Sequence, residues 1–187
     1  LSEFSFHVSG PLMMVYWLRD LKFDYIELAI LINVSQVLGL FSMRYWGRRI
    51  DNNGSYSTIR FTSFCIAIFP MFWVGIYYLP NELILAGSII IASLASLMFS
   101  GRALALDNRL YEHMKNKKMI KVTSKRFFFR GLSIFIGGLI GGLLTRNEGS
   151  FSNYIELDTV IHAVMGFSTV LRLGVWSYFL IDKRSEI

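Results

Sequence analysis

The sequence predicts an all-α integral membrane protein with six transmembrane helices, and three observations support this. Apolar residues make up 53% of the chain and charged residues 17%, where soluble proteins carry about 25% charged residues. Five long stretches are almost free of charge, and most approach the roughly 20 residues that a helix needs to cross a bilayer. The polar breaks between them alternate between strongly and weakly basic. The five stretches are 26–43, 59–78, 83–101, 131–144 and 160–181.

We expect helices over about 4–18, 25–43, 57–78, 82–106, 124–145 and 158–181, forming a single domain over residues 1–187. The first is short, since 4–18 spans only about 22 Å, and Gly10 and Pro11 interrupt it. The second begins with a capping box, because Asp24 precedes it and Glu27 lies three residues further on.

The remaining helices have their own boundary signals. Pro70 lies inside the third helix and predicts a kink. Pro80 opens the fourth helix. The fifth carries small-x-x-x-small pairs, which favour close helix packing, formed by Gly137, Gly138, Gly141 and Gly142. The sixth begins near Asp158 and ends before the polar tail.

The basic residues predict the orientation, because cytoplasmic loops of membrane proteins are enriched in lysine and arginine. One side of the predicted helices carries only Arg19, Lys22 and Arg146. The other side carries Arg44, Arg48, Arg49, Arg60, Arg102, Arg109, Lys115, Lys117, Lys118, Lys121, Lys125, Arg126, Arg130, Lys183 and Arg184. We therefore expect a multi-pass protein of the cell membrane with both ends of this segment in the cytoplasm.

The net charge of +6 also admits nucleic-acid binding, and three phenylalanines, 127–129, lie within the basic cluster. Basic residues next to membrane helices are more simply explained by the orientation rule and by contact with anionic lipid. We expect the lipid bilayer, and no nucleic acid, as a partner.

A short motif lies between the second and third predicted helices. Gly47, Asp51 and Gly54 are spaced so that two glycines bracket an aspartate. Glycines permit a tight reversal, and an aspartate is favoured at a helix N-terminus. A tight turn with a helix cap explains the pattern equally well.

In this setting the motif resembles the cytoplasmic loop motif G-x-x-x-D-x-x-G of the major facilitator superfamily. Gly47, Asp51 and Gly54 match it, whereas Asn52, Ser55 and Tyr56 replace its usual basic positions. The first segment, with Pro11 and Tyr16, resembles the family's seventh helix, residues 105–110 the end of its tenth, and residues 137–142 its eleventh. The resemblance implies the C-terminal six-helix half of a twelve-helix transporter.

The resemblance implies further expectations. The chain is then a fragment of a longer protein, or a half-transporter that assembles with itself, and the missing N-terminal half is its partner. The first, second, fourth and fifth helices line a central cavity, while the third and sixth are peripheral. Asp51 with its two glycines forms a gate contact and does not bind substrate.

Polar residues inside membrane helices are costly and are therefore candidates for function. Asn33 and Gln36 are three residues apart and share one helix face. They either bind a polar solute or connect helices by amide hydrogen bonds. His7 either relays protons or bonds a nearby carbonyl. Arg102 either binds an anionic group or extends to the headgroups, and we favour the second. If the sixth helix is peripheral, we expect Arg172 to be structural or paired, and not a ligand.

No histidine, cysteine and carboxylate cluster has metal-ligand spacing, and neither a nucleophile elbow nor a phosphate-binding loop is present. We therefore expect no cofactor, no metal site, no catalytic residue and no enzyme activity. The predicted function is a secondary active transporter that moves a small solute by alternating access. The alternatives are a lipid-modifying intramembrane enzyme using His7, Arg102 and Asp107, and a membrane scaffold without transport. The sequence leaves the substrate, the direction of transport and any coupling ion open.

Overall fold

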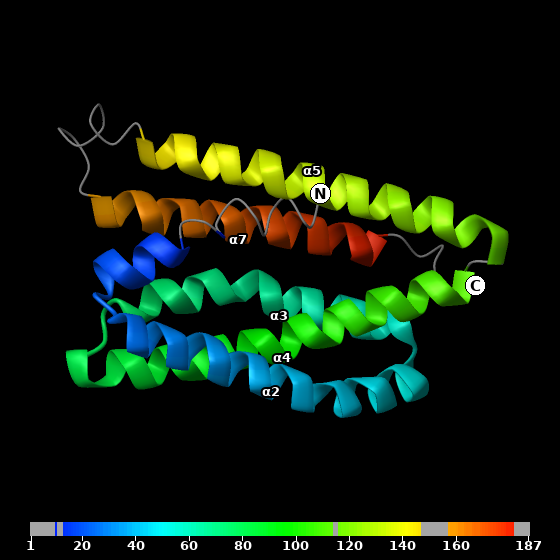
Figure 1. The fold of residues 1–187 in the computed structure, drawn as a ribbon, viewed down its shortest axis with the longest axis horizontal. Coiled ribbons are helices and arrows are strands. Elements are labelled where there is room, and N and C mark those ends of the chain that lie inside the picture. Colours follow the sequence, from blue (N-terminus) through cyan, green and yellow to red (C-terminus); the bar gives the residue numbers. More distant parts are fainter. Residues whose placement is uncertain (1–9, 11–12, 114–115, 147–156, 182–187) are drawn as a thin grey trace.

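The computed structural model describes residues 10, 13–113, 116–146 and 157–181, and every regular element within them is helical. A short π-helical turn, η1 (Tyr16–Asp20), comes first (Figure 1). Five long helices follow: α2 (Tyr25–Asn53), α3 (Ser55–Ile76), α4 (Asn81–His113), α5 (Asn116–Arg146) and α7 (Leu157–Ile181). The predicted all-α class is confirmed, whereas most of the predicted first helix (4–18) lies outside the described residues.

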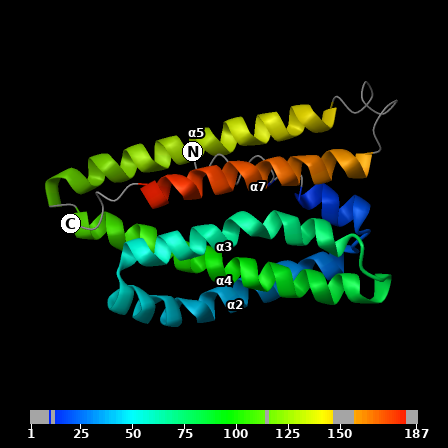
Figure 2. The same ribbon diagram turned by 180° about the vertical axis from the view of Figure 1, so that it is seen from behind.

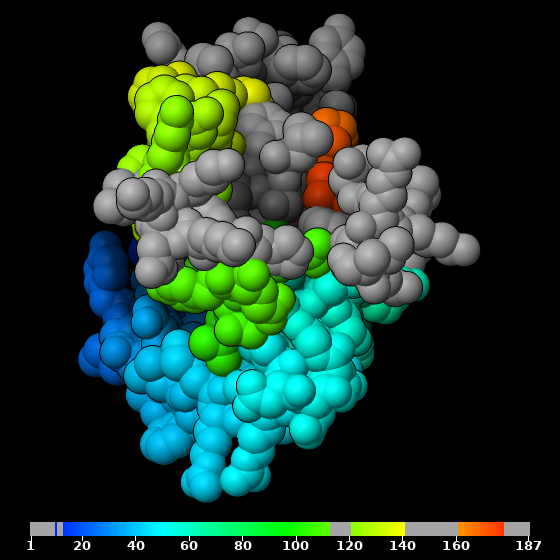
Figure 3. Space-filling model, turned by 90° about the vertical axis from the view of Figure 1, so that its right-hand side faces the viewer, coloured from blue at the N-terminus to red at the C-terminus, as the bar shows by residue number. Residues whose placement is uncertain are grey.

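Successive long helices run in opposite directions, as Figures 1 and 2 show. The C-terminal ends of α2, α4 and α7 therefore lie at the same end of the bundle as the N-terminal ends of α3 and α5. Figure 3 looks onto this end, with the α2–α3 junction in cyan below and α5 in yellow-green above. Because these helix ends carry most of the arginines and lysines, we call it the basic end.

The second helix is longer than predicted, since α2 continues to Asn53 and not to residue 43. Its 29 residues reach about 43 Å, which exceeds a hydrocarbon core of about 30 Å. The expected loop does not exist, because Gly54 alone separates α2 from α3. Gly54 has φ +80°, a conformation that strongly favours glycine. At its other end, α2 begins with the predicted capping box of Asp24 and Glu27.

Three of the described helices are long and apolar enough to cross a membrane: Tyr25–Asn53, Ser55–Ile76 and Asn81–Glu112. They support a membrane-associated protein. Length and composition in the described part of the chain therefore identify three spans, where the sequence analysis predicted six.

The centre of the bundle is α3. It packs against α4 and α7, and α4 packs in turn against α2, whereas α5 makes no comparably extensive contact with another described helix. Half of the most apolar stretch of α3 is buried, against 17% for α2 and 11% for α4. A cluster of buried side chains joins α3 to η1, α2 and α7 at the end opposite the basic end: Tyr16, Leu21, Phe23, Leu28, Leu31, Trp73, Ile76, Ile161 and Met165. The third helix was expected to be peripheral, and in this bundle it is central.

Two glycines allow α2 and α4 to approach closely. A Cβ atom at Gly101 of α4 would overlap the indole ring of Trp46 on α2. A Cβ at Gly39 of α2 would likewise overlap the Ser96 hydroxyl and lie 2.8 Å from the Ser100 hydroxyl. The Trp46 Nε1 donates a hydrogen bond of 2.8 Å to the Leu97 carbonyl of α4. Small residues that admit a neighbouring helix are the usual basis of helix packing in membranes.

We predict that Gly101→Ala destabilises the protein, because the added methyl group meets the rigid, buried Trp46 ring. Overpacking of this kind costs about 1–3 kcal/mol. Gly75→Ala is the matched control, since a Cβ there meets nothing within 4 Å. Thermal unfolding in detergent should show a lower melting temperature for Gly101→Ala and little change for Gly75→Ala. Equal melting temperatures would show that the α2–α4 contact tolerates a wider spacing.

Candidate functional site

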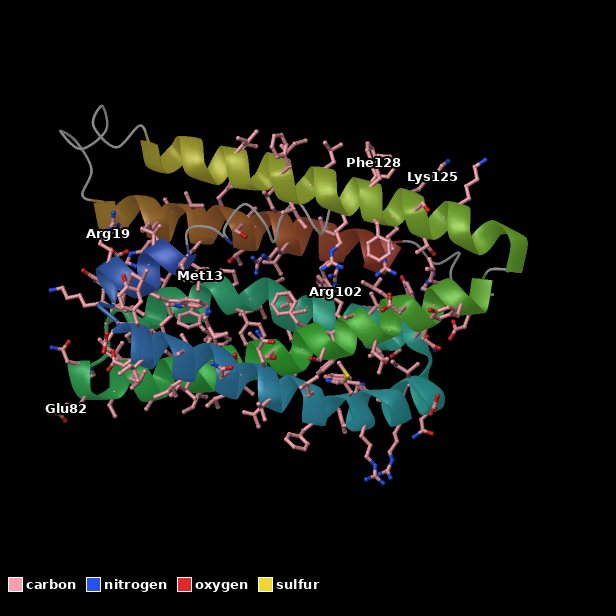
Figure 4. The ribbon with its side chains drawn as sticks, viewed as in Figure 1. Met13, Arg19, Glu82, Arg102, Lys125 and Phe128 are labelled. Carbon is pink, nitrogen blue, oxygen red and sulfur yellow. The ribbon has the colours of Figure 1, made fainter. Side chains whose placement is uncertain are left out.

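A cavity of about 570 Å³ lies among the first segment, α2, α3, α4 and α7. Its size is within the usual range for small-molecule sites. Most of the lining is apolar or aromatic, and Arg172 is the one charged side chain among the described lining residues. The lining consists of Gly10, Met13, Trp17, Ser35, Gln36, Leu40, Met43, Phe69, Pro70, Trp73, Ala92, Ala95, Ser96, Phe99, Ser100 and Arg172. Met13, labelled in Figure 4, belongs to the segment before η1.

The first segment is held against α3 at this cavity. The Tyr16 hydroxyl donates a hydrogen bond of 2.8 Å to the Trp73 carbonyl, in the last turn of α3. The rings of Trp17 and Trp73 lie 5.4 Å apart. Tyr16 is fully buried. The segment therefore forms one wall of the cavity.

Two of the serine hydroxyls in the lining are bonded within their own helices. Ser35 donates to the Ile32 carbonyl at 2.9 Å, and Ser100 donates to the Ser96 carbonyl at 2.9 Å. Such local bonds are common for serine in helices. Ser96 and Ser100 also lie against Gly39 of α2, so these small side chains contribute to the close packing of α2 and α4.

The structure separates Asn33 from Gln36. Gln36 lines the cavity, is exposed and makes no hydrogen bond within the described part of the chain. The Asn33 amide donates to the Ala29 carbonyl of its own helix at 2.7 Å and lies outside the cavity lining. Gln36 is therefore the better placed of the two to contact a bound solute, whereas both roles stay predictions.

Arg172 is buried beside Pro70 of α3. Proline has no N–H, so Pro70 leaves the Ile66 carbonyl, four residues earlier, without its helical donor. The Arg172 Nη1 donates to that same carbonyl at 3.3 Å, and the side chain is 9% exposed. The expectation that Arg172 is structural agrees with this contact, which the sequence alone did not predict. The same side chain also gives the cavity its positive charge.

Arg102 reaches the same face of α3 from α4. Its Nε donates to the Ser63 hydroxyl at 3.2 Å, and the residue is 5% exposed. It therefore lies inside the bundle (Figure 4), and the interpretation that it extends to the headgroups is wrong. Ser63 and Ile66 are one helical turn apart, so two buried arginines lie next to one turn of α3. Arg102 is not among the described residues that line the cavity, and its contact with a substrate stays a prediction.

Gly47 and Asp51 of the motif lie on the last turns of α2, Gly54 follows the helix directly, and the predicted loop is absent. Asp51 is exposed and lies near the C-terminus of α2, where the helix dipole disfavours a carboxylate. Asp51 is therefore not stabilised by the N-terminus of α2, the helix to which it belongs. A Cβ at Gly47 would meet nothing within 4 Å, so only Gly54 serves the reversal.

The predicted packing glycines of α5 and the candidate His7 are only partly within the described residues. Gly137 is buried, which fits close packing, whereas a Cβ at Gly138 would meet nothing within 4 Å. The surroundings of Gly141 and Gly142 lie outside the described residues, as does His7. No group of three potential metal ligands is present in the described part of the chain.

Sequence reasoning missed a polar network at the basic end. The Ser55 hydroxyl donates to the Glu112 carboxylate at 2.8 Å, and the Asn108 amide donates to both residues at 2.9 Å. Asp107 pairs with Arg126 of α5 at 2.8 Å. These contacts join the start of α3 and α5 to the end of α4. Only the four-residue spacing of Asn108 and Glu112 on one helix could have indicated any part of it.

We find no match to this chain among protein-family models, curated proteins or solved structures.

We predict that Arg172 and Pro70 are energetically coupled. Arg172→Met leaves the Ile66 carbonyl without this donor, at a cost of about 1–3 kcal/mol. Pro70→Ala restores an N–H that can bond that carbonyl, so the same arginine substitution should cost about 1 kcal/mol less in the Pro70→Ala background. The measurement is the free energy of unfolding in detergent for both single variants and the double variant.

A second contact between α7 and α3 provides the control for this cycle. The Trp176 Nε1 donates to the Arg60 carbonyl at 3.1 Å, away from Pro70. The effects of Trp176→Phe and Pro70→Ala should therefore add. Simple additivity of Arg172→Met and Pro70→Ala would show that Arg172 does not compensate the proline.

Proposed function

We propose that the chain is one half of a secondary active transporter similar to the major facilitator superfamily, moving a small solute by alternating access. The observation that carries the proposal is the cavity of about 570 Å³ within a bundle of apolar helices. Gln36 lies eleven residues into α2, or about 17 Å from its start. This depth is close to the middle of a hydrocarbon core of about 30 Å, where secondary transporters bind their substrates.

The proposed transporter crosses the cell membrane six times, with the basic end and both ends of this segment in the cytoplasm. Support comes from the alternating helix directions and from the gathering of basic helix ends at one end of the bundle (Figure 1). In Figure 4, Arg19 and Glu82 lie at one end and Lys125 at the other. The positive-inside rule assigns the Lys125 end to the cytoplasm.

The bundle differs in one respect from the arrangement that the resemblance implies. There, the first, second, fourth and fifth helices line a cavity between two halves. In this chain, α3 and α7 also line the cavity, and α5 contributes none of the described lining residues. The cavity is therefore a partly open space within one half. In the proposed transporter, Gln36 faces both this space and the missing N-terminal half, because it lines the cavity and is exposed.

Asp51 is proposed to act as a gate contact at the basic end. It is exposed and unfavourably placed for the dipole of α2, so a cationic or hydrogen-bonding partner on the other half would relieve an existing cost. Gly54 provides the reversal that brings the start of α3 next to it. The proposal assigns Asp51 to one conformational state and not to the solute.

The enzyme alternative receives no support from the contacts of its residues. Asp107 is paired with Arg126, and Arg102 is bonded to Ser63 inside the bundle. Asn108 bonds Ser55 and Glu112. Each of these side chains already connects two helices, which is a structural task.

Alternating access predicts that a cysteine at Gln36 becomes accessible from both sides of the membrane in turn. Gln36→Cys in a Cys65→Ser background, reconstituted in vesicles, should react with an impermeant maleimide added on either side. Phe41→Cys is the control, since Phe41 is 78% exposed on α2 and does not line the cavity. This assay needs no knowledge of the solute.

A scaffold, in contrast, would leave Gln36→Cys reactive from at most one side, and that result would contradict the proposal. Asp51→Ala tests the gate in the same assay. Loss of a contact made in one state should change the ratio of the two labelling rates. An unchanged ratio would count against the gate and leave the cavity assignment intact.

Topology can be tested with exposed residues at opposite ends. Asn52 is at the basic end and Glu82 starts α4 at the other; both are exposed. Cysteines at the two positions, in a Cys65→Ser background, should be labelled from opposite sides of intact cells, with position 52 cytoplasmic. Labelling of both from one side would contradict the alternating crossings of α2, α3 and α4.

A further inference from the structure

A second cavity, of about 370 Å³, lies at the basic end among α2, α3 and α7. It is separate from the central cavity and shares no lining residue with it. Its described lining residues are two arginines, a serine and four aromatic residues, and none of them is acidic: Arg49, Tyr56, Ser57, Arg60, Phe61, Phe64 and Trp176.

The Arg49 guanidinium is held in place at this cavity. Its central carbon lies 4.6 Å from the centre of the Phe61 ring, which is a cation–π distance. One of its nitrogens donates to the Tyr45 hydroxyl at 3.3 Å. The Nε is buried and has no hydrogen-bond acceptor in the described part of the chain. A fixed guanidinium with an unused donor favours an anionic acceptor.

The second arginine comes from a different helix. Arg60 of α3 is exposed, and its backbone carbonyl accepts the hydrogen bond from Trp176. Ser57 lies one turn before it, near the N-terminal end of α3, where the helix dipole also favours negative charge. Two guanidinium groups and a hydroxyl therefore line one small space.

The other side of the cavity is apolar. The Phe64 and Trp176 rings lie 4.8 Å apart, and the Trp176 hydrogen bond to Arg60 fixes α7 against α3. From Tyr56 to Phe64 the lining extends eight residues along α3, or about 12 Å. This distance covers the headgroup layer and the first part of the hydrocarbon core.

We infer that this cavity binds the headgroup of an anionic phospholipid from the leaflet at the basic end. The arginines and Ser57 hold the phosphate oxygens, and Phe64 and Trp176 contact the first carbons of the acyl chains. A free phosphate would satisfy the arginines but would not use the apolar wall. The inference requires a membrane protein with this end at a lipid surface, and it does not depend on transport.

The test is native mass spectrometry of the full chain purified in detergent, titrated with phosphatidylglycerol or with phosphatidylcholine. We expect one phosphatidylglycerol to bind preferentially. The double variant Arg49→Gln/Arg60→Gln should weaken it by about tenfold or more, the effect of losing a charge-assisted hydrogen bond. The matched control is Arg44→Gln/Arg48→Gln, which removes the same charge from exposed positions of α2 outside the cavity. The control should change binding by less than about twofold.

Three results would overturn the inference. Equal weakening in both double variants would show diffuse attraction to the basic end. Equal binding of phosphatidylcholine would show that the negative headgroup is not recognised. Full displacement of phosphatidylglycerol by millimolar inorganic phosphate would identify a free phosphate as the ligand. If the double variant does not fold, Arg60→Gln alone carries the test, because Arg60 is exposed and its side chain is not needed for the Trp176 contact.

Discussion

The arrangement of the bundle depends on the close approach of α2 and α4 at Gly39 and Gly101. Lipid tails are as apolar as leucine, so apolar side chains gain little by leaving lipid for another helix. Close backbone contact and interhelical hydrogen bonds have to hold the helices together instead. Gly101 admits the Trp46 indole, and Trp46 in turn bonds the Leu97 carbonyl. This contact places Gln36 of α2 opposite Ser96 and Ser100 of α4, and so forms two walls of the central cavity.

The third wall depends on a proline inside an apolar helix. In a bilayer every backbone polar group needs a partner from the protein, and Pro70 removes one from the Ile66 carbonyl. Arg172 of α7 supplies a donor for it. The proline, the buried arginine and the packing of α7 on α3 therefore belong together. Arg172 also lines the cavity, so the residue that bonds the carbonyl freed by Pro70 also gives the cavity its positive charge.

The two ends of the bundle are built differently. The end near Tyr16 is closed by a cluster of large apolar side chains around Trp73 and Ile161. At the basic end, the helices extend beyond what a hydrocarbon core requires and are joined by polar contacts among Ser55, Asn108 and Glu112. Arg49 and Arg60 take no part in these polar contacts, and they line the second cavity together with Phe64 and Trp176. Both cavities follow from the same central position of α3, which lines each of them.

The sequence by itself determined the helical class, the order and direction of the helices, the capping box at Asp24 and the proline in α3. These features follow from apolar length, charge and local residue chemistry, all of which are readable along the chain. The sequence did not determine where α2 ends, because the extra turns beyond residue 43 lie outside the apolar stretch. Nor did it determine that α3 is central.

Only the tertiary structure decided the neighbours of individual polar residues. Asn33 and Gln36 share a helix face, and yet one amide bonds its own helix while the other lines a cavity. Arg102 is directed to Ser63 and Arg172 to Ile66, partners that are 39 and 106 residues away along the chain. Spacing within a helix gives the face of a residue and not the neighbour on that face. The neighbour is set by packing between helices, and no local pattern in the sequence records it.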